Sequence, residues 1–144
     1  MNAYDRVVKF LSYRLRSENE IRQKLEQKGF AKPEIKQTIV KLKEEKLIDD
    51  AQFARAWIVN REIVSPRGRK LIFLELRQKG VDKELIEKTL RAEYDNEREL
   101  SLASKIAEKK NKFYQKLPEK ERRQKIIRFL QRRGFSWEII RKVI

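Results

Sequence analysis

The chain of 144 residues contains no cysteine and no histidine. Without cysteine it can form no disulfide bond and offers no thiolate to a metal, and without histidine it lacks the usual proton shuttle at neutral pH. These absences exclude Cys nucleophiles, His-assisted Ser nucleophiles and Cys/His zinc sites. We therefore expect a protein that is not an enzyme, with no catalytic residues, no metal site and no cofactor.

Glycine, proline and long apolar runs are also scarce. The four glycines and three prolines are too few for a sheet protein with many turns. No run of 18 apolar residues is present, and the N-terminus lacks the apolar core of a signal peptide. We expect no membrane association and a cytoplasmic location.

Positive charge is abundant and unevenly distributed. The 37 Lys and Arg against 22 Asp and Glu give a net charge of +15, which predicts an acidic or polyanionic partner, most simply nucleic acid. The alternative is a helical protein whose Lys and Glu serve only solubility. Residues 105–133 contain twelve Lys or Arg against three Glu, so the last third of the chain carries the strongest field.

One apolar pattern surrounds three of the four glycines. An isoleucine lies eight residues before each glycine and a leucine four before it, an apolar residue follows directly, and isoleucine or leucine recurs six and ten residues beyond. Apolar residues four apart mark the buried stripe of a helix, and a glycine just after them suits the left-handed position that closes one. The pattern predicts helix, tight turn, helix at Gly29, Gly80 and Gly134.

The spacing of these glycines predicts an all-α protein built from repeats. The glycines lie 51 and 54 residues apart, so we expect three tandem three-helix repeats with helix-turn-helix-like units, at 1–48, 49–94 and 95–144. Each repeat alone is small, so neighbours should support one another. In the first helix we expect Tyr4, Val7, Val8, Leu11 and Leu15 on the buried face.

Local sequence also predicts where several helices begin. Ser17 with Glu20 three residues later forms a capping box, Asp82 and Ser136 suit N-caps, and Pro33 suits a first turn. Asp49 and Asp50 resemble a metal or acid/base pair, but no third ligand is near in sequence. We interpret them as a helix start.

Two further stretches admit more than one interpretation. The loop 65–70 gathers three cations beside Gly68, which suits either a phosphate or carboxylate contact or an ordinary solvated connector. Trp57 has apolar neighbours on its helical face and should belong to the core. The pair Phe113-Tyr114 could stack on bases, but we favour the interpretation that both rings pack against the core of the third repeat.

Taken in order, these motifs make the chain resemble the RecX family of bacterial recombination regulators. The motifs that carry the resemblance are Arg16, Ser17, Glu20 and Ile21, the corner Leu25 to Gly29, Leu47 to Asp50 with Phe53-Ala54, Arg67-Gly68, the corner Leu76 to Gly80, and Arg132 to Phe135. The resemblance implies three tandem three-helix repeats in an elongated, curved arrangement. It supplies no catalytic residues.

The resemblance also implies partners. Members of the family bind the RecA recombinase, lodge in the groove of its filament on single-stranded DNA, and restrain ATP hydrolysis and strand exchange or promote disassembly. Family members also bind DNA directly. We therefore expect a monomer that acts in homologous recombination, DNA repair and the SOS response, with a RecA-type filament and single- and double-stranded DNA as partners, without sequence specificity.

Charge alone selects the residues that would contact DNA or the filament. These candidates are Arg14, Arg16, Arg55, Arg61, Arg67, Arg69, Lys70, Lys109, Lys110, Arg122, Arg123, Lys125, Arg128, Arg132 and Arg133. We expect Arg55 and Arg61 to be exposed on the first helix of the second repeat.

Two other function classes compete with this hypothesis. A helix-turn-helix-like basic DNA-binding protein without RecA involvement would need base-facing donors early in the third helix of a repeat. There the chain exposes carboxylates instead, at Glu34, Glu84, Glu87 and Glu138, so base readout is disfavoured. A metal-dependent nuclease would need a convergent cluster, which the spacing of Asp49, Asp50, Glu62 and Glu75 does not give.

Overall fold

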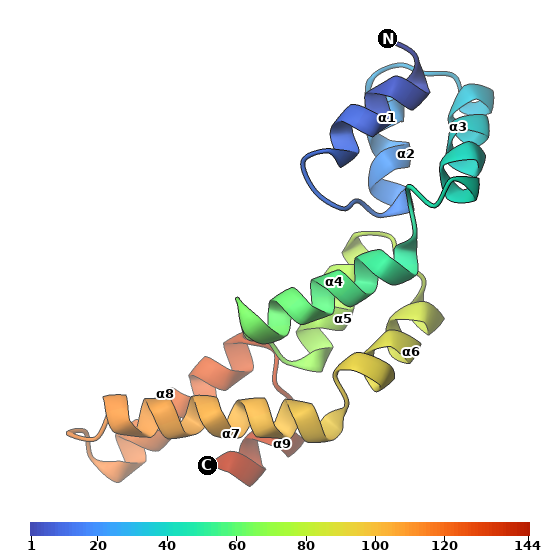
Figure 1. The fold of residues 1–144 in the computed structure, drawn as a ribbon. Helices are drawn as coiled ribbons and strands as arrows, with labels where there is room; N and C mark the ends of the chain where they lie inside the picture. The colour runs from blue at the N-terminus through green and yellow to red at the C-terminus, as the bar shows by residue number, and fades with distance from the viewer.

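The computed structural model describes residues 1–144 and contains nine α-helices and no strand, which confirms the all-α prediction. The helices form three three-helix units in tandem, and Figure 1 shows that the units follow one another in an elongated and curved molecule. None of the nine helices combines the length and apolar character needed to cross a bilayer. The helices are α1 (Ala3–Leu11), α2 (Glu18–Gln27), α3 (Lys32–Glu44), α4 (Asp50–Ile63), α5 (Arg69–Gln78), α6 (Lys83–Glu93), α7 (Asn96–Phe113), α8 (Glu119–Arg132) and α9 (Trp137–Val143).

Each group of three helices encloses a core of its own. The three cores contain eight, nine and seven buried residues, in chain order. The repeated apolar pattern supplies most of them: Ile21 and Leu25 in the first repeat, and their counterparts in the other two, are fully or almost fully buried. Because each core is small, contacts between repeats must contribute to stability.

The three glycine corners have the backbone that the sequence predicts. Gly29, Gly80 and Gly134 have φ of +84°, +81° and +86°. In the first corner the Phe30 amide donates to the Leu25 carbonyl at 3.2 Å, the long bond of a Schellman ending, and the equivalent bonds close α5 and α8 at 3.1 Å each. Each glycine therefore ends one helix and redirects the chain into the next.

The predicted helix starts are also present. Ser17 and Glu20 form the capping box of α2, Asp82 and Ser136 cap α6 and α9, and Pro33 lies in the first turn of α3. The side chain of Asp49 accepts the amides of Ala51 and Gln52 at the start of α4. The interpretation of Asp49-Asp50 as a helix start is confirmed.

The prediction for the first helix was partly wrong. Val7 is buried, and Tyr4 and Leu11 pack against the core, but Val8 and Leu15 are each 43% exposed. Helix α1 ends at Leu11, so Leu15 lies in the following loop, and one residue step along α1 turns Val8 away from the inward side. Ala3, which the prediction did not include, is buried in this core.

The aromatic residues follow the predictions except at one position. Trp57 packs half-buried against the second core, and its indole N–H donates to Glu75 at 3.2 Å. Tyr114 packs against the third core as expected. Phe113 was expected to do the same but is 76% exposed, because one residue step along the helix points its side chain away from the side on which Tyr114 packs.

Candidate functional site

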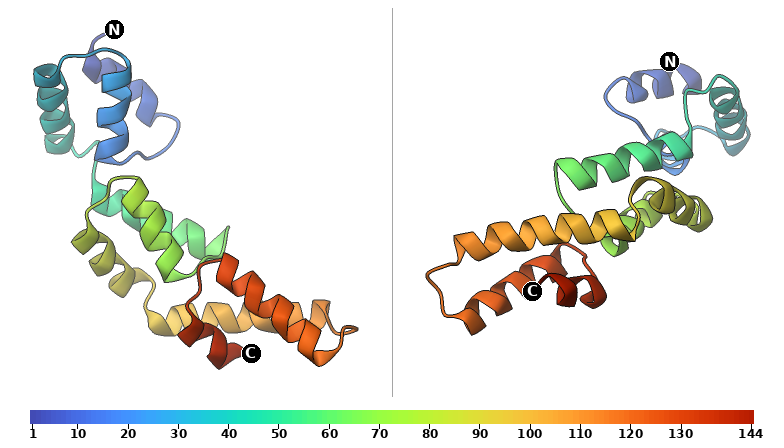
Figure 2. Two further views of the ribbon diagram at one scale, coloured as in Figure 1. Left: turned by 180° about the vertical axis from the view of Figure 1, so that it is seen from behind. Right: turned by 60° about the horizontal axis from the view of Figure 1, so that its bottom comes forward.

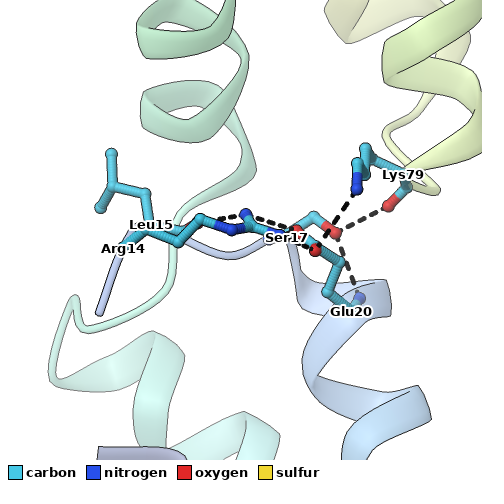
Figure 3. A network of polar contacts seen from close by, with 5 residues as sticks. All are labelled: Arg14, Leu15, Ser17, Glu20 and Lys79. Atoms are coloured by element: carbon cyan, nitrogen blue, oxygen red, sulfur yellow. Dashed lines mark hydrogen bonds and ion pairs between the residues drawn. The ribbon is translucent and has the colours of Figure 1, made fainter. Parts of the chain in front are cut away.

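Both junctions between repeats use one arrangement. The glycine corner of the later repeat meets the start of the middle helix of the earlier repeat. At the first junction the Ser17 hydroxyl donates to the Lys79 carbonyl at 2.7 Å, as Figure 3 shows. At the second the Gly68 amide donates to the Arg133 carbonyl at 2.7 Å. Lys79 and Arg133 both directly precede the corner glycine, so the two junctions are in register.

A carboxylate from the later repeat adds a second hydrogen bond at each junction. Asp50 at the start of α4 accepts the Glu18 amide at 2.8 Å, and Glu99 near the start of α7 accepts the Arg69 amide at 2.7 Å. Both amides belong to the first turn of a helix, where N–H groups lack internal partners and the dipole favours negative charge. Burial raises the pKa of the Asp50 and Glu99 carboxyls, against the opposing effect of these bonds.

An ion cluster surrounds the first junction (Figure 3). Glu20 accepts hydrogen bonds from the Arg14 guanidinium and the Ser17 amide, and Lys79 lies 3.7 Å away from its carboxylate. Burial alone would raise the pKa of Glu20, but these donors and charges hold it below its ordinary value. Lys79 of repeat 2 thus pairs with Glu20 of repeat 1, and Arg14 and Ser17 of repeat 1 hold that carboxylate in place.

The loop 65–70 forms the second junction. A Cβ on Gly68 would collide with the Gly134 carbonyl, so only glycine allows this approach. The Tyr94 hydroxyl donates to the Arg67 carbonyl at 3.0 Å, and the Arg69 guanidinium donates to the Tyr94 carbonyl at 2.9 Å. Of the two interpretations left open for this loop, the ordinary solvated connector does not hold, because Gly68 is buried against repeat 3. A phosphate contact would meet Arg67 and Arg69 side chains that are already engaged within the protein.

Besides Arg67 and Arg69, the candidates Arg61 and Arg16 also make contacts within the protein. Arg61, expected to be exposed, pairs with Glu75 at 3.0 Å and lies 4.5 Å from the Trp57 ring centroid. Arg67 pairs with the same carboxylate at 3.1 Å. The Arg16 guanidinium covers the Phe10 ring at 3.8 Å.

The remaining candidates make no ion pair with a carboxylate of the protein. Seven of the eight ion pairs involve residues 14–98, and of the twelve cations in 105–133 only Lys112 has a carboxylate within reach, Glu108 at 4.0 Å. The other eleven cations of residues 105–133 therefore have no carboxylate partner. Besides Arg16 and Arg69, the candidates without a carboxylate partner are Arg55, Lys70, Lys109, Lys110, Arg122, Arg123, Lys125, Arg128, Arg132 and Arg133.

The hairpin of α7 and α8 carries eight of these ten. Its tip lies at the end of the molecule opposite repeat 1 in both views of Figure 2. Phe129 lies between two of its cations, with Lys110 at 4.1 Å and Arg133 at 5.1 Å from its ring centroid. We name this hairpin, residues 96–132 with Arg133, the basic hairpin. Its exposed ammonium and guanidinium groups can contact phosphates or acidic protein surface.

Sequence reasoning missed the residues that join the repeats. Asp50 is the first residue of α4 but Glu99 is the fourth of α7, so comparing the repeats in register does not align the two acceptors. The sequence around Ser17 predicts a capping box, but no residue near it in the sequence predicts that its hydroxyl also donates to the Lys79 carbonyl. No group of three or more His, Cys, Asp or Glu side chains converges as metal ligands would.

Comparison with known proteins bears on the whole chain. Models of the first, second and third three-helix domains of RecX match residues 3–42, 49–90 and 97–144. The regulatory protein RecX of Finegoldia magna is 35% identical over 98% of this chain and 69% of its own length. That of Bacillus licheniformis is 36% identical over 95% of this chain and 52% of its own.

Solved structures agree with the sequence matches. The crystal structure of RecX from Lactobacillus salivarius superposes with a TM-score of 0.88 at 29% identity, covering 98% of this chain and 91% of that one. A second crystal structure of a regulatory protein RecX gives 0.84 at 30% identity and covers 70% of that chain. The chain spans about half the length of the first curated relatives it matches. On this evidence, the chain belongs to the RecX family of regulatory proteins.

Proposed function

We propose that this protein regulates a RecA-type recombinase, binding along its filament on single-stranded DNA and restraining ATP hydrolysis and strand exchange. The observation that carries the proposal is the basic hairpin, which lies at one end of a curved molecule and whose Lys and Arg from 105 to 133 have almost no carboxylate partners. A recombinase filament presents both phosphates and acidic protein surface, and the free cations of the hairpin suit either. Membership of a family of regulatory proteins supports a regulatory role.

The junctions between repeats explain how several weak contacts with the filament together give a high affinity. We propose repeats at 1–48, 49–94 and 95–144, each able to touch the filament. Once one repeat is bound, the hydrogen-bonded joints hold the next near its own contact, so the later contacts form at a high effective concentration. A protein that bridges neighbouring recombinase subunits in this way would slow their ATP hydrolysis without catalysing a reaction itself.

The structure narrows the proposed contact surface. Arg14, Arg61 and Arg67 pair with carboxylates, and Arg69 donates to the Tyr94 carbonyl. Arg16 lies over the Phe10 ring with its Nε buried. We remove these five arginines from the proposed surface. The ten free candidates remain, and eight of them lie on the basic hairpin. A helix-turn-helix reader gains no support, because Glu34, Glu84 and Glu138 lie exposed in the first turns of α3, α6 and α9.

Sedimentation with preformed filaments tests the proposal. Filaments of a RecA-type recombinase on single-stranded DNA, held by a slowly hydrolysed ATP analogue, should carry the protein into the pellet. Reversing two exposed cations of the hairpin, Arg123→Glu with Arg128→Glu, should weaken this binding at least about tenfold, because fewer counterions are released.

A matched control separates this surface from net charge. Lys32→Glu with Lys36→Glu makes the same change in charge on exposed residues of α3 that pair with no carboxylate. We expect this control to bind nearly as the unaltered protein does. Equal losses in the two variants would show that the hairpin is not the contact surface, and failure of the unaltered protein to sediment with filaments would refute the proposed function.

A further inference from the structure

A groove of about 420 Å³ lies between repeats 2 and 3. One wall is α5, with Lys70 and Leu74, and the other is the corner that joins α8 to α9, with Arg132 and Trp137. The corner is fixed against α5 because Gly134 packs directly on Leu71. The groove thus has a closely packed floor, an apolar side chain on each wall, and a cation on each of α5 and α8.

Trp137 presents an open aromatic face in this groove. It is 53% exposed, and Leu74 across from it is 50% exposed. Repeat 3 does not use this indole in its core, which Phe135, Ile139 and Ile140 fill instead. The other tryptophan, Trp57, is covered by Arg61 and hydrogen-bonded to Glu75, so it offers no such face.

The first junction provides an internal comparison. It has the same architecture, and counting from the corner glycines and the middle helices gives the residues that correspond to Lys70, Leu74, Arg132 and Trp137. These residues are Asn19, Gln23, Gln78 and Lys83. The fold therefore does not require an aromatic ring, an exposed leucine or this pair of cations at a junction, and their presence at the second needs another reason.

The charges around the groove identify its ligand. No Asp or Glu lines it. The larger groove of about 730 Å³ between α5, α6, α7 and α9 is lined by four glutamates beside four cations, so its lining carries no net positive charge to attract a polyanion. The apolar groove along α4 has one cation, Arg55, and no aromatic ring. A smaller pocket of about 150 Å³ at Phe129 also has three cations and no carboxylate, but Lys110 and Arg133 already lie against its ring. The groove at Trp137 combines an open indole with cations and no carboxylate.

We infer that this groove binds an unpaired base of single-stranded DNA, stacked on Trp137, with the flanking phosphates held by Lys70 and Arg132. The inference rests on the proposed function and names the DNA contact of that surface. Every base has a π-face, so stacking on an indole needs no particular sequence, whereas the bases of a duplex are already stacked on each other. An acidic peptide could use the cations but would leave the indole face without a flat partner.

Tryptophan emission tests the stacking directly. In a Trp57→Phe background the protein has Trp137 as its only tryptophan. Adding oligothymidylate should quench its emission along the same isotherm that fluorescence anisotropy of a labelled oligothymidylate reports. Trp137→Ala should weaken binding about tenfold without changing the salt dependence, and Trp137→Phe should retain part of the affinity.

The phosphate contacts have their own readout. Lys70→Gln with Arg132→Gln should flatten the plot of log affinity against log salt by about 0.7 for each lost contact, as counterion release on single strands predicts. Tyr13→Ala is the control, because Tyr13 is 73% exposed but lies in repeat 1, far along the chain from the groove. Its affinity and salt slope should match those of the unaltered protein.

The outcomes separate this inference from the proposed function. Oligothymidylate binding without a change in Trp137 emission, and with unaltered affinity in Trp137→Ala, would overturn the stacking site and leave the filament regulator intact. Quenching by polyglutamate but not by oligothymidylate would reassign the groove to an acidic protein partner. If the protein binds no oligothymidylate at all, the inference also falls, and sedimentation with filaments then decides the proposed function by itself.

Discussion

Gly29, Gly80 and Gly134 share a left-handed backbone, but only the last two touch another repeat. A Cβ on Gly29 would meet nothing within 4 Å, whereas one on Gly80 would collide with the Cβ of Asn19 at the start of α2. A Cβ lies too close to the backbone to swing aside, so the second collision must displace a helix. The same residue type therefore ends a helix in all three places and also seals a junction in two of them.

Alanine at these two glycines should separate the two roles. Gly29→Ala should cost about 1 kcal/mol of unfolding free energy, because only the backbone strain is added. Gly80→Ala adds overpacking at the junction and should cost at least about 2 kcal/mol. Urea unfolding followed by circular dichroism measures both, and equal losses would show that the first junction is not closely packed.

At this scale the sequence predicts what is local. Positive φ at the three glycines and the caps at Ser17, Asp82 and Ser136 depend on residues at most five apart, so the pattern predicts them. Which cations are free depends on distant partners instead. Arg98, for example, pairs with Glu62, 36 residues away. No spacing in the sequence shows that pairing, which is why the candidate list contained five engaged arginines.

At the scale of helices, each junction is a shared helix end. The first amides of α2 and α5 lack partners within their own repeats and receive them from α4 and α7. The helices and their cores could be predicted because apolar residues recur every three or four positions. The junctions could not, since they join residues such as Ser17 and Lys79, which are 62 positions apart.

Removing the acceptor at the second junction should destabilise the protein. Glu99 is 5% exposed, so Glu99→Ala leaves the buried Arg69 amide unpaired and should cost about 1–3 kcal/mol. Glu99→Gln keeps an oxygen acceptor and avoids ionising a carboxyl whose pKa burial has raised, so it should retain most of the stability. Thermal unfolding measures both effects.

Glu97→Ala is the control for this pair. Glu97 lies exposed in the same first turn of α7, and its side chain makes no hydrogen bond or ion pair. Its loss should change the melting temperature little. If Glu99→Ala melts like this control, Glu99 does not hold repeats 2 and 3 together.

At the scale of the whole molecule, ion pairs and unpaired cations are divided along the chain. Repeats 1 and 2 contain most of the ion pairs and both sides of the first junction, while repeat 3 carries the unpaired cations on a projecting hairpin. The sequence predicted the basic third repeat from composition alone. It did not predict the exposed Trp137 beside it, because apolar periodicity does not show which aromatic side chains remain open.

The rate of ATP hydrolysis by a RecA-type recombinase on single-stranded DNA tests the proposed function most directly. As the intact protein is titrated in, we expect the rate to fall and then level off. The Arg123→Glu, Arg128→Glu variant should require far more protein for the same effect, and the Lys32→Glu, Lys36→Glu control should not. An unchanged rate at concentrations where sedimentation shows filaments saturated with the protein would contradict the account.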